Sequence, residues 1–243
     1  MSVTMRFDTN HRRRNLVAMS IVMLALMMYA LIPFARAQSS NHLDVFTTDS
    51  KPYGLTYGEW TARWWQWANS IPKPDNPAVD NTGKNCAIDQ NGPVWFLAGT
   101  FGGSAERTCT IPSGKAILIP IFNSECSYAE FPALKSESEL RSCAKSLQDK
   151  TTSLEATIDG MSIQGLEKYR VASPLFNLTF PENNVAGVSP GLTQGVSDGN
   201  WLFLKPLPPG KHEIHFAGAS VDIATTSTNN FATAATYHVT VNP

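Results

Sequence analysis

Residues 187–199, GVSPGLTQGVSDG, contain the pattern G-x-S-x-G twice, centred on Ser189 and Ser197. In many esterases this pattern holds a nucleophilic serine on a strained turn between a strand and a helix. Neither copy is followed by a helical pattern, because Pro190 and Gly191 follow the first serine and an apolar strand pattern follows the second. We therefore interpret the segment as two glycine-rich turns in a loop between strands, and not as a nucleophile elbow.

Four other residues have the chemistry of a hydrolytic site. His212, in HEIH, is a candidate general base, and Ser104 follows two glycines whose amides suit an oxyanion hole. Asp198 and Glu125 are candidate carboxylates, and Glu125 precedes a cysteine that would fix its position. Each has a structural alternative, such as a hydrogen-bonded strand histidine or a hairpin tip. HEIH is not a chelating pair, because His212 and His215 would lie on opposite faces of a strand.

The segment 72–93 is too rich in Pro, Gly, Asn and Asp to form a regular element. Asp75, Asp80 and Asp89 supply the hard oxygen ligands that calcium prefers. No EF-hand spacing is present, and such residues also form turns without any metal. Both interpretations stay open, with calcium as the expected cofactor if there is one.

A tryptophan-rich helix is predicted over residues 57–70. Thr56 and Glu59 form a capping box at its start, and the helix must end before Pro72. Trp60, Trp64 and Trp67 form one apolar stripe, whereas Trp65 lies off the stripe. We therefore predict Trp65, together with Trp95 further along, as substrate contacts.

The remaining pattern is mainly β, with a second helix predicted over 137–150 behind a Ser136/Glu139 capping box. Short apolar or β-branched runs alternate with Gly and Pro turns, and Asp159-Gly160 is typical of a type I′ hairpin. We expect an antiparallel β-sandwich, immunoglobulin-like or jelly-roll-like, decorated by two helices. The predicted strands are 94–99, 107–112, 115–122, 153–158, 161–166, 174–180, 200–207, 212–218 and 235–241.

The N-terminus resembles an export signal. Arg12, Arg13 and Arg14 precede an apolar run, and Ala35-Arg36-Ala37 suits cleavage before Gln38. We predict a signal peptide over 1–37 and a single domain over 38–243, secreted or periplasmic, with membrane contact only before cleavage. An uncleaved anchor and a twin-arginine signal are the alternatives. The chain has a formal net charge of −1 and loses five arginines with the signal, which argues against nucleic-acid binding.

All four cysteines lie in the predicted exported part, and an even number in an oxidising compartment predicts disulfides. Of the three possible connectivities we favour Cys86–Cys109 with Cys126–Cys143, because these pairs close the shorter loops. A zinc site is the weaker alternative, since no C-x-x-C pair or nearby histidine is present.

Four segments resemble a family of small exported bacterial proteins of uncharacterised function: YGEWTARWWQWANSIP, NGPVWFLAGT, IDG and PLPPGKHEIHF. The resemblance covers about Tyr53 to Val241. It implies export, one recurring domain, and lactone or ester hydrolysis with calcium.

Two classes of function follow. The first is a secreted, calcium-assisted hydrolase of small acyl esters or lactones, for example acyl-homoserine lactones. The second is a non-enzymatic β-sandwich that binds glycans, lipid headgroups or a protein partner through its Trp-rich segment.

Overall fold

The computed structural model describes residues 43–221 and 230–243. The chain divides into two units, Met1–His42 and Leu43–Pro243, and the second contains every described element. The signal peptide predicted over 1–37 lies outside the described residues. Within the described part, no helix is both long enough and apolar enough to cross a membrane.

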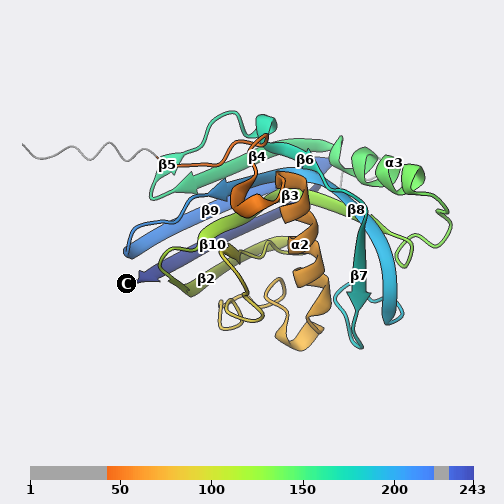
Figure 1. Cartoon of the computed structure of the whole chain (residues 1–243), viewed down its shortest axis with the longest axis horizontal. Coiled ribbons are helices and arrows are strands. Elements are labelled where there is room, and N and C mark those ends of the chain that lie inside the picture. Colours follow the sequence, from red (N-terminus) through yellow and green to blue (C-terminus); the bar gives the residue numbers. More distant parts are fainter. Residues whose placement is uncertain (1–42, 222–229) are drawn as a thin grey trace, which may run out of the picture. The chain divides into compact units, whose positions relative to one another are not determined.

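The described part of the chain is mainly β, with two α-helices (Figure 1). The helices are α2 (Tyr57–Ser70) and α3 (Glu137–Gln148), and short 3-10 turns occur at Pro52–Gly54, Lys73–Asp75 and Leu166–Tyr169. The strands are β1 (Val94–Phe96), β2 (Gly103–Pro112), β3 (Ala116–Ser127), β4 (Thr151–Ile158), β5 (Met161–Ser162), β6 (Arg170–Ala172), β7 (Phe176–Phe180), β8 (Gly191–Leu204), β9 (Gly210–Val221) and β10 (Asn230–Asn242).

These strands form two open mixed sheets that pack together. The first sheet has the order β1-β3-β8-β6, with β7 also paired to β8, and the second has the order β2-β10-β9-β4-β5. The predicted two-sheet, mainly β fold with two helices is confirmed. Two strand pairs, β1/β3 and β2/β10, run parallel, so the sheets are not purely antiparallel. The reason is that β2, between β1 and β3 in sequence, crosses to the other sheet, and parallel neighbours need such a crossover.

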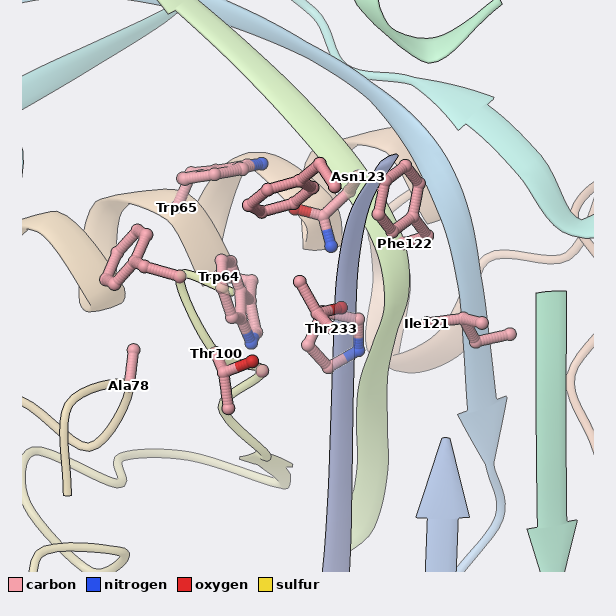
Figure 2. Close-up of a pocket in the computed structure, with 12 residues that line it drawn as sticks. Trp64, Trp65, Ala78, Thr100, Ile121, Phe122, Asn123 and Thr233 are labelled. Atoms are coloured by element: carbon pink, nitrogen blue, oxygen red, sulfur yellow. The ribbon is translucent and has the colours of Figure 1, made fainter. Parts of the chain in front are cut away.

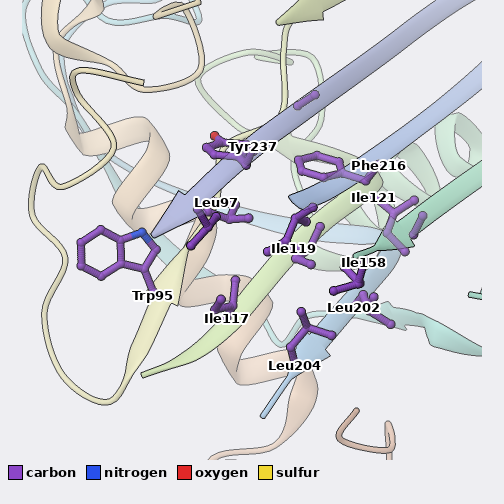
Figure 3. Packing of buried hydrophobic residues seen from close by; sticks show 14 of the residues in the cluster. Trp95, Leu97, Ile117, Ile119, Ile121, Ile158, Leu202, Leu204, Phe216 and Tyr237 are labelled. Atoms are coloured by element: carbon purple, nitrogen blue, oxygen red, sulfur yellow. The ribbon is translucent and has the colours of Figure 1, made fainter. Parts of the chain in front are cut away.

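The core has two apolar layers. One lies between the sheets (Figure 3) and includes Ile117, Ile119, Leu202, Ile214 and Phe216. The other lies between the first sheet and α2, which crosses that sheet in Figure 1. Helix α2 therefore covers the face of β3 and β8 that is turned away from the second sheet.

Helix α2 begins and ends as predicted. The Thr56 hydroxyl accepts the Glu59 amide, and the Glu59 carboxylate accepts the Thr56 amide, which completes the capping box. The stripe of Trp60, Trp64 and Trp67 is buried against the first sheet. This burial, and not intrinsic helix propensity, stabilises the helix, because isolated helices of this length are marginal in water.

Helix α3 also has its predicted capping box, formed by Ser136 and Glu139. It ends at Gln148, two residues before the predicted end, where the Gln148 side chain donates to the Phe122 carbonyl and to Asn200. Its buried face contacts β3 and β8 around Cys126 and Val196.

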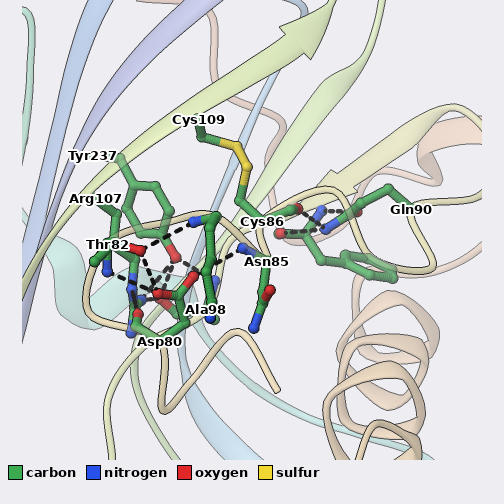
Figure 4. Close-up of a disulfide and its surroundings, with 11 residues drawn as sticks. Asp80, Thr82, Asn85, Cys86, Gln90, Ala98, Arg107, Cys109 and Tyr237 are labelled. Atoms are coloured by element: carbon green, nitrogen blue, oxygen red, sulfur yellow. Dashed lines mark hydrogen bonds between the residues drawn. A yellow bond between two sulfur atoms is a disulfide. The ribbon is translucent and has the colours of Figure 1, made fainter. Parts of the chain in front are cut away.

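The predicted disulfides Cys86–Cys109 and Cys126–Cys143 are confirmed. The first ties the loop 72–93 to β2 (Figure 4), next to Arg107, whose guanidinium donates to backbone carbonyls of the loop and to the Tyr237 hydroxyl. The second ties α3 to β3. Two disulfides indicate an oxidising, extracytoplasmic compartment.

The predicted Asp159-Gly160 hairpin is confirmed, since both residues have positive φ between β4 and β5. The prediction of turns across 187–199 is wrong for its second half. Gly187, with φ 68°, does lie in a turn, but β8 begins at Gly191 and includes Gly195, Ser197 and Gly199. Pairing with β3 and β7 overrides the local preference of these glycines for turns.

Candidate functional site

The second G-x-S-x-G copy forms one face of a two-strand ladder. Along β3 and β8, Asn123 pairs with Gly199, Glu125 with Ser197, and Ser127 with Gly195. Paired residues point to the same face, and this face continues through Trp201, which packs under α2. A row of polar side chains from β3 therefore lies on the α2 side of the sheet, beside two glycines and a serine.

The two glycines are needed for space. A Cβ on Gly199 would overlap the Asn123 side chain and lie 2.7 Å from its Cα. A Cβ on Gly195 would collide with Glu125 Oε1 and lie 3.1 Å from the Cys126 carbonyl oxygen. Neither glycine has the positive φ expected of a turn. The motif therefore lets the Asn123 and Glu125 side chains lie close over the neighbouring strand.

A cavity of about 100 Å³ lies at the Asn123 end of this row (Figure 2). Its lining is mostly aromatic and aliphatic, with hydrogen-bonding groups from only a few side chains. The lining side chains are Trp64, Trp65, Ala78, Thr100, Phe101, Pro120, Ile121, Phe122, Asn123, Phe231 and Thr233. Elements far apart in sequence thus form the cavity: α2, the loop 72–93, the loop after β1, β3 and the start of β10.

Glu125 lies one position deeper on the same face and is 7% exposed. Burial raises the pKa of its carboxyl group well above the usual range, and the hydrogen bond and charge of Glu130 raise the pKa further, whereas Ser127 lowers it. The Ser127 hydroxyl also donates to Glu130 Oε2 at 2.6 Å. Glu125 and Ser127 are buried and Glu130 is half-buried, so two carboxyl groups and a hydroxyl group lie close together where the buried region begins.

Several buried polar atoms in this region have no hydrogen-bond partner among the described residues. They are Trp65 Nε1, Glu125 Oε1 and Ser197 Oγ. Buried polar groups are normally paired in folded proteins, so such atoms mark places where a ligand, ion or water completes the structure. Trp95 Nε1 and Trp201 Nε1 share this property, so an unpaired indole does not by itself identify a site.

The other catalytic candidates do not join Glu125. His212 lies in the second sheet, where Nδ1 contacts Asp159 Oδ2 and Nε2 contacts the Pro208 carbonyl, both at 2.8 Å. Ser104 is exposed on β2 and pairs with Ala234, whereas His212 pairs with Val239. Five residues along β10 separate these two by roughly 17 Å in the strand direction alone, and β10 itself lies between their strands.

Asp198 lies next to Ser197 in β8 and so points to the opposite face of the sheet from Glu125. It receives two hydrogen bonds from Arg170, at 2.9 and 2.8 Å. This ion pair lies beside the end of α3 and away from the Trp65 cavity. The four candidates thus occupy four separate places in the fold.

The acidic residues of the loop 72–93 do not gather either. Both carboxylate oxygens of Asp80 accept hydrogen bonds from Thr82 and Asn85 (Figure 4), as in a turn without metal. Asp75 and Asp89 are exposed. No group of three or more His, Cys, Asp or Glu residues among the described residues has a metal-binding arrangement.

The two predicted substrate contacts are in different environments. Trp65 is half-buried and lines the cavity (Figure 2), as its position off the apolar stripe suggested. Trp95 is buried in the layer between the sheets (Figure 3).

Sequence reasoning missed Asn123, Ser127 and Glu130, as well as the two phenylalanines at the cavity mouth. The predicted strand 115–122 stopped where its apolar run stops, but β3 continues to Ser127. The alternation Asn123, Glu125, Ser127 was a usable signal, since polar residues at every second position indicate one polar face of a continuing strand.

The chain matches no protein-family model, no curated protein and no solved structure.

Proposed function

We propose that this protein is an exported domain that binds a neutral, amphipathic small molecule in the Trp65 cavity. The observation that carries the proposal is the cavity of about 100 Å³ with its aromatic lining and one amide side chain. Small-molecule sites are typically concave and apolar with a few polar groups that orient the ligand.

The lining favours an uncharged ligand. No Asp, Glu, Lys, Arg or His lines the cavity within the described residues, so a charged group would lose its hydration without a partner. The amide of Asn123 offers both a donor and an acceptor, and Thr100 and Thr233 offer hydroxyl groups. An amide, ester or lactone group beside an apolar chain or ring fits this chemistry.

The ligand extends beyond the cavity. Typical pockets for whole small molecules exceed about 300 Å³, so this cavity holds only part of one. Phe101 and Phe231 line the cavity and are 55% and 45% exposed. These rings offer apolar surface to the remainder of an acyl or aromatic molecule.

The disulfides support an extracytoplasmic location. We propose that residues 1–37 act as a cleaved signal peptide, so that the domain meets its ligand in the periplasm or outside the cell. Mass spectrometry of the exported protein tests this, and a mature N-terminus at Gln38 is the expected result.

Calorimetric titration with hexanamide and with hexanoate tests ligand binding. The two differ in charge but share the same chain, so we expect hexanamide to bind and hexanoate to bind at least tenfold more weakly. Phe231→Ala should weaken hexanamide binding, whereas Phe131→Ala, an exposed phenylalanine outside the lining, should not. Equal binding of the two compounds, or equal effects of the two variants, would contradict the proposal.

Hydrolysis of small acyl esters or lactones is a second candidate function. The observation that favours it is that Glu125, with its partner Glu130, lies on the same face of β3 as the cavity residue Asn123. Paired carboxyl groups with different environments can move protons during catalysis. The test is turnover of an acyl lactone and of 4-nitrophenyl acetate, with and without EDTA, compared between the wild type, Glu125→Gln and the exposed-site control Glu182→Gln. Turnover no faster than in buffer would exclude this function.

A further inference from the structure

We infer that Glu125, Glu130, Ser127 and Ser197 form a binding site for a divalent cation that prefers oxygen ligands, on the α2 side of β3 and β8. This site is separate from the acidic loop 72–93 and does not depend on the proposed ligand cavity.

Glu125 and Glu130 have no cationic partner of their own. No lysine or arginine is among the groups that act on Glu125, and no ion pair between described residues includes either glutamate. Ser127 lies on the same face of β3 as Glu125, and its hydroxyl group donates to Glu130 Oε2 at 2.6 Å. Carboxyl groups arranged around one hydroxyl group in this way can hold either a shared proton or a bound cation.

Two buried oxygen atoms at this place have no hydrogen-bond partner among the described residues. Ser197 is 1% exposed, and its hydroxyl has no partner among the described residues. It pairs directly with Glu125 across the ladder, so its side chain points to the same face. Glu125 Oε1 also accepts no hydrogen bond from a described donor. A shared proton between the glutamates leaves the Ser197 hydroxyl unexplained, whereas a cation uses it as a ligand.

These four side chains supply only oxygen ligands. Two carboxylates and two hydroxyl groups give up to six oxygen atoms, and calcium takes six to eight oxygen ligands in flexible geometry. Sulfur and imidazole, which zinc prefers, are absent from these four side chains. Gly195 is part of the arrangement, because any side chain there would collide with Glu125 Oε1. Calcium is therefore the first probe, and magnesium, which demands stricter octahedral geometry, is expected to bind more weakly.

Terbium luminescence tests the inference. Terbium substitutes for calcium and emits when a nearby indole transfers energy to it. Trp65 and Ala129, the residue before Glu130, pack against the same apolar cluster of α2 and β7. Protein treated with EDTA should show terbium emission on excitation of tryptophan, and calcium should displace the terbium. Glu125→Gln and Glu130→Gln should each weaken binding at least about tenfold, and Ser197→Ala should weaken it less.

Two controls keep the result unambiguous. Glu182→Gln changes an exposed carboxylate and should leave terbium binding unchanged. Asp80→Asn tests the acidic loop 72–93 as an alternative site. If Asp80→Asn abolished terbium binding while Glu125→Gln retained it, the assignment of the cation site to Glu125 would be overturned. Emission and melting temperature that do not respond to cations in the wild type would also overturn it, and the pair would then share a proton. Hexanamide binding is measured in a separate experiment. The cation site and the ligand cavity are therefore tested independently, and failure of one does not affect the test of the other.

Discussion

The α2-facing side of β3 and β8 has two halves with different chemistry. In one half, which we call the lower half, apolar strand residues pack against the tryptophans of the helix; these residues are Leu118, Trp201 and Phe203 with Trp60, Trp64 and Trp67. In the other, which we call the upper half, β3 contributes Asn123, Glu125 and Ser127, and they pair with Gly199, Ser197 and Gly195 of β8. The same two strands and the same helix thus enclose an apolar core and a polar site.

The indole groups differ in the same way. Trp60, Trp64 and Trp67 donate to the carbonyls of Pro52, Leu97 and Ile88 at 2.8, 2.7 and 2.9 Å. Trp65, which faces the upper half, has no partner for its Nε1 among the described residues. The three helix indoles of the lower half are paired with backbone carbonyls, and of the polar atoms there the Trp201 indole is left without a partner among the described residues. The upper half leaves Trp65 Nε1, Glu125 Oε1 and Ser197 Oγ without a described partner. Function is therefore expected in the upper half.

The largest expected effect is that of Gly199→Ala. The added Cβ would overlap Asn123, whose backbone Cα is only 2.7 Å away, so we expect destabilisation of about 3 kcal/mol or more in urea denaturation. Gly187→Ala is the matched control, because Gly187 has positive φ but open space, and should cost about 1 kcal/mol. A cost for Gly199→Ala no larger than that of the control would mean that the strands do not pack this closely.

A comparison of two tryptophans tests the two halves directly. Trp67→Phe, outside the cavity lining, leaves the Ile88 carbonyl without its indole partner and should cost about 2 kcal/mol of unfolding free energy. Trp65→Phe removes an N–H that has no partner among the described residues and should cost less than about 1 kcal/mol. Hexanamide binding should show the reverse order, with the larger loss in Trp65→Phe. If the variant that loses more stability also lost more hexanamide affinity, the distinction between the two halves would be contradicted.

Thr56→Ala should act on stability alone. It removes the cap of α2, which covers both halves, and should lower the free energy of unfolding by about 1 kcal/mol. Thermal denaturation measures the loss, and calorimetry should find ligand and cation affinities within twofold of the wild type. A tenfold loss of either affinity would show that the helix start belongs to the site.

The smallest effects are expected for the two motif serines. Ser189 lies outside regular structure, and the Ser197 hydroxyl has no partner within the part of the chain that the structure describes. Ser189→Ala and Ser197→Ala should therefore each change stability by less than about 0.5 kcal/mol. Any ester or lactone turnover should persist in Ser189→Ala. Abolished turnover in a well-folded Ser189→Ala protein would restore the nucleophile interpretation of the first motif.

Local signals in the sequence were sufficient for the helices, the hairpin and the disulfides. Thr56 with Glu59, Ser136 with Glu139 and Asp159 with Gly160 each act within a few residues of themselves. The mixed sheets and the course of β8 depend on partners distant in sequence, which local patterns do not specify. The candidate site was only partly predictable for the same reason: Trp65 and Glu125 were identified singly, but Phe101 and Phe231, which line one cavity from opposite parts of the chain, were not.

The most direct test of the account is the response of the indole N–H signals to hexanamide in a ¹⁵N–¹H NMR titration. The Trp65 signal is identified by its disappearance in Trp65→Phe, and those of Trp60 and Trp67 by the corresponding variants. The account predicts that the Trp65 signal shifts in a saturable manner while the Trp60 and Trp67 signals, whose N–H groups are bonded to backbone carbonyls, stay in place. An unchanged Trp65 signal, or equal shifts of all three, would contradict the account.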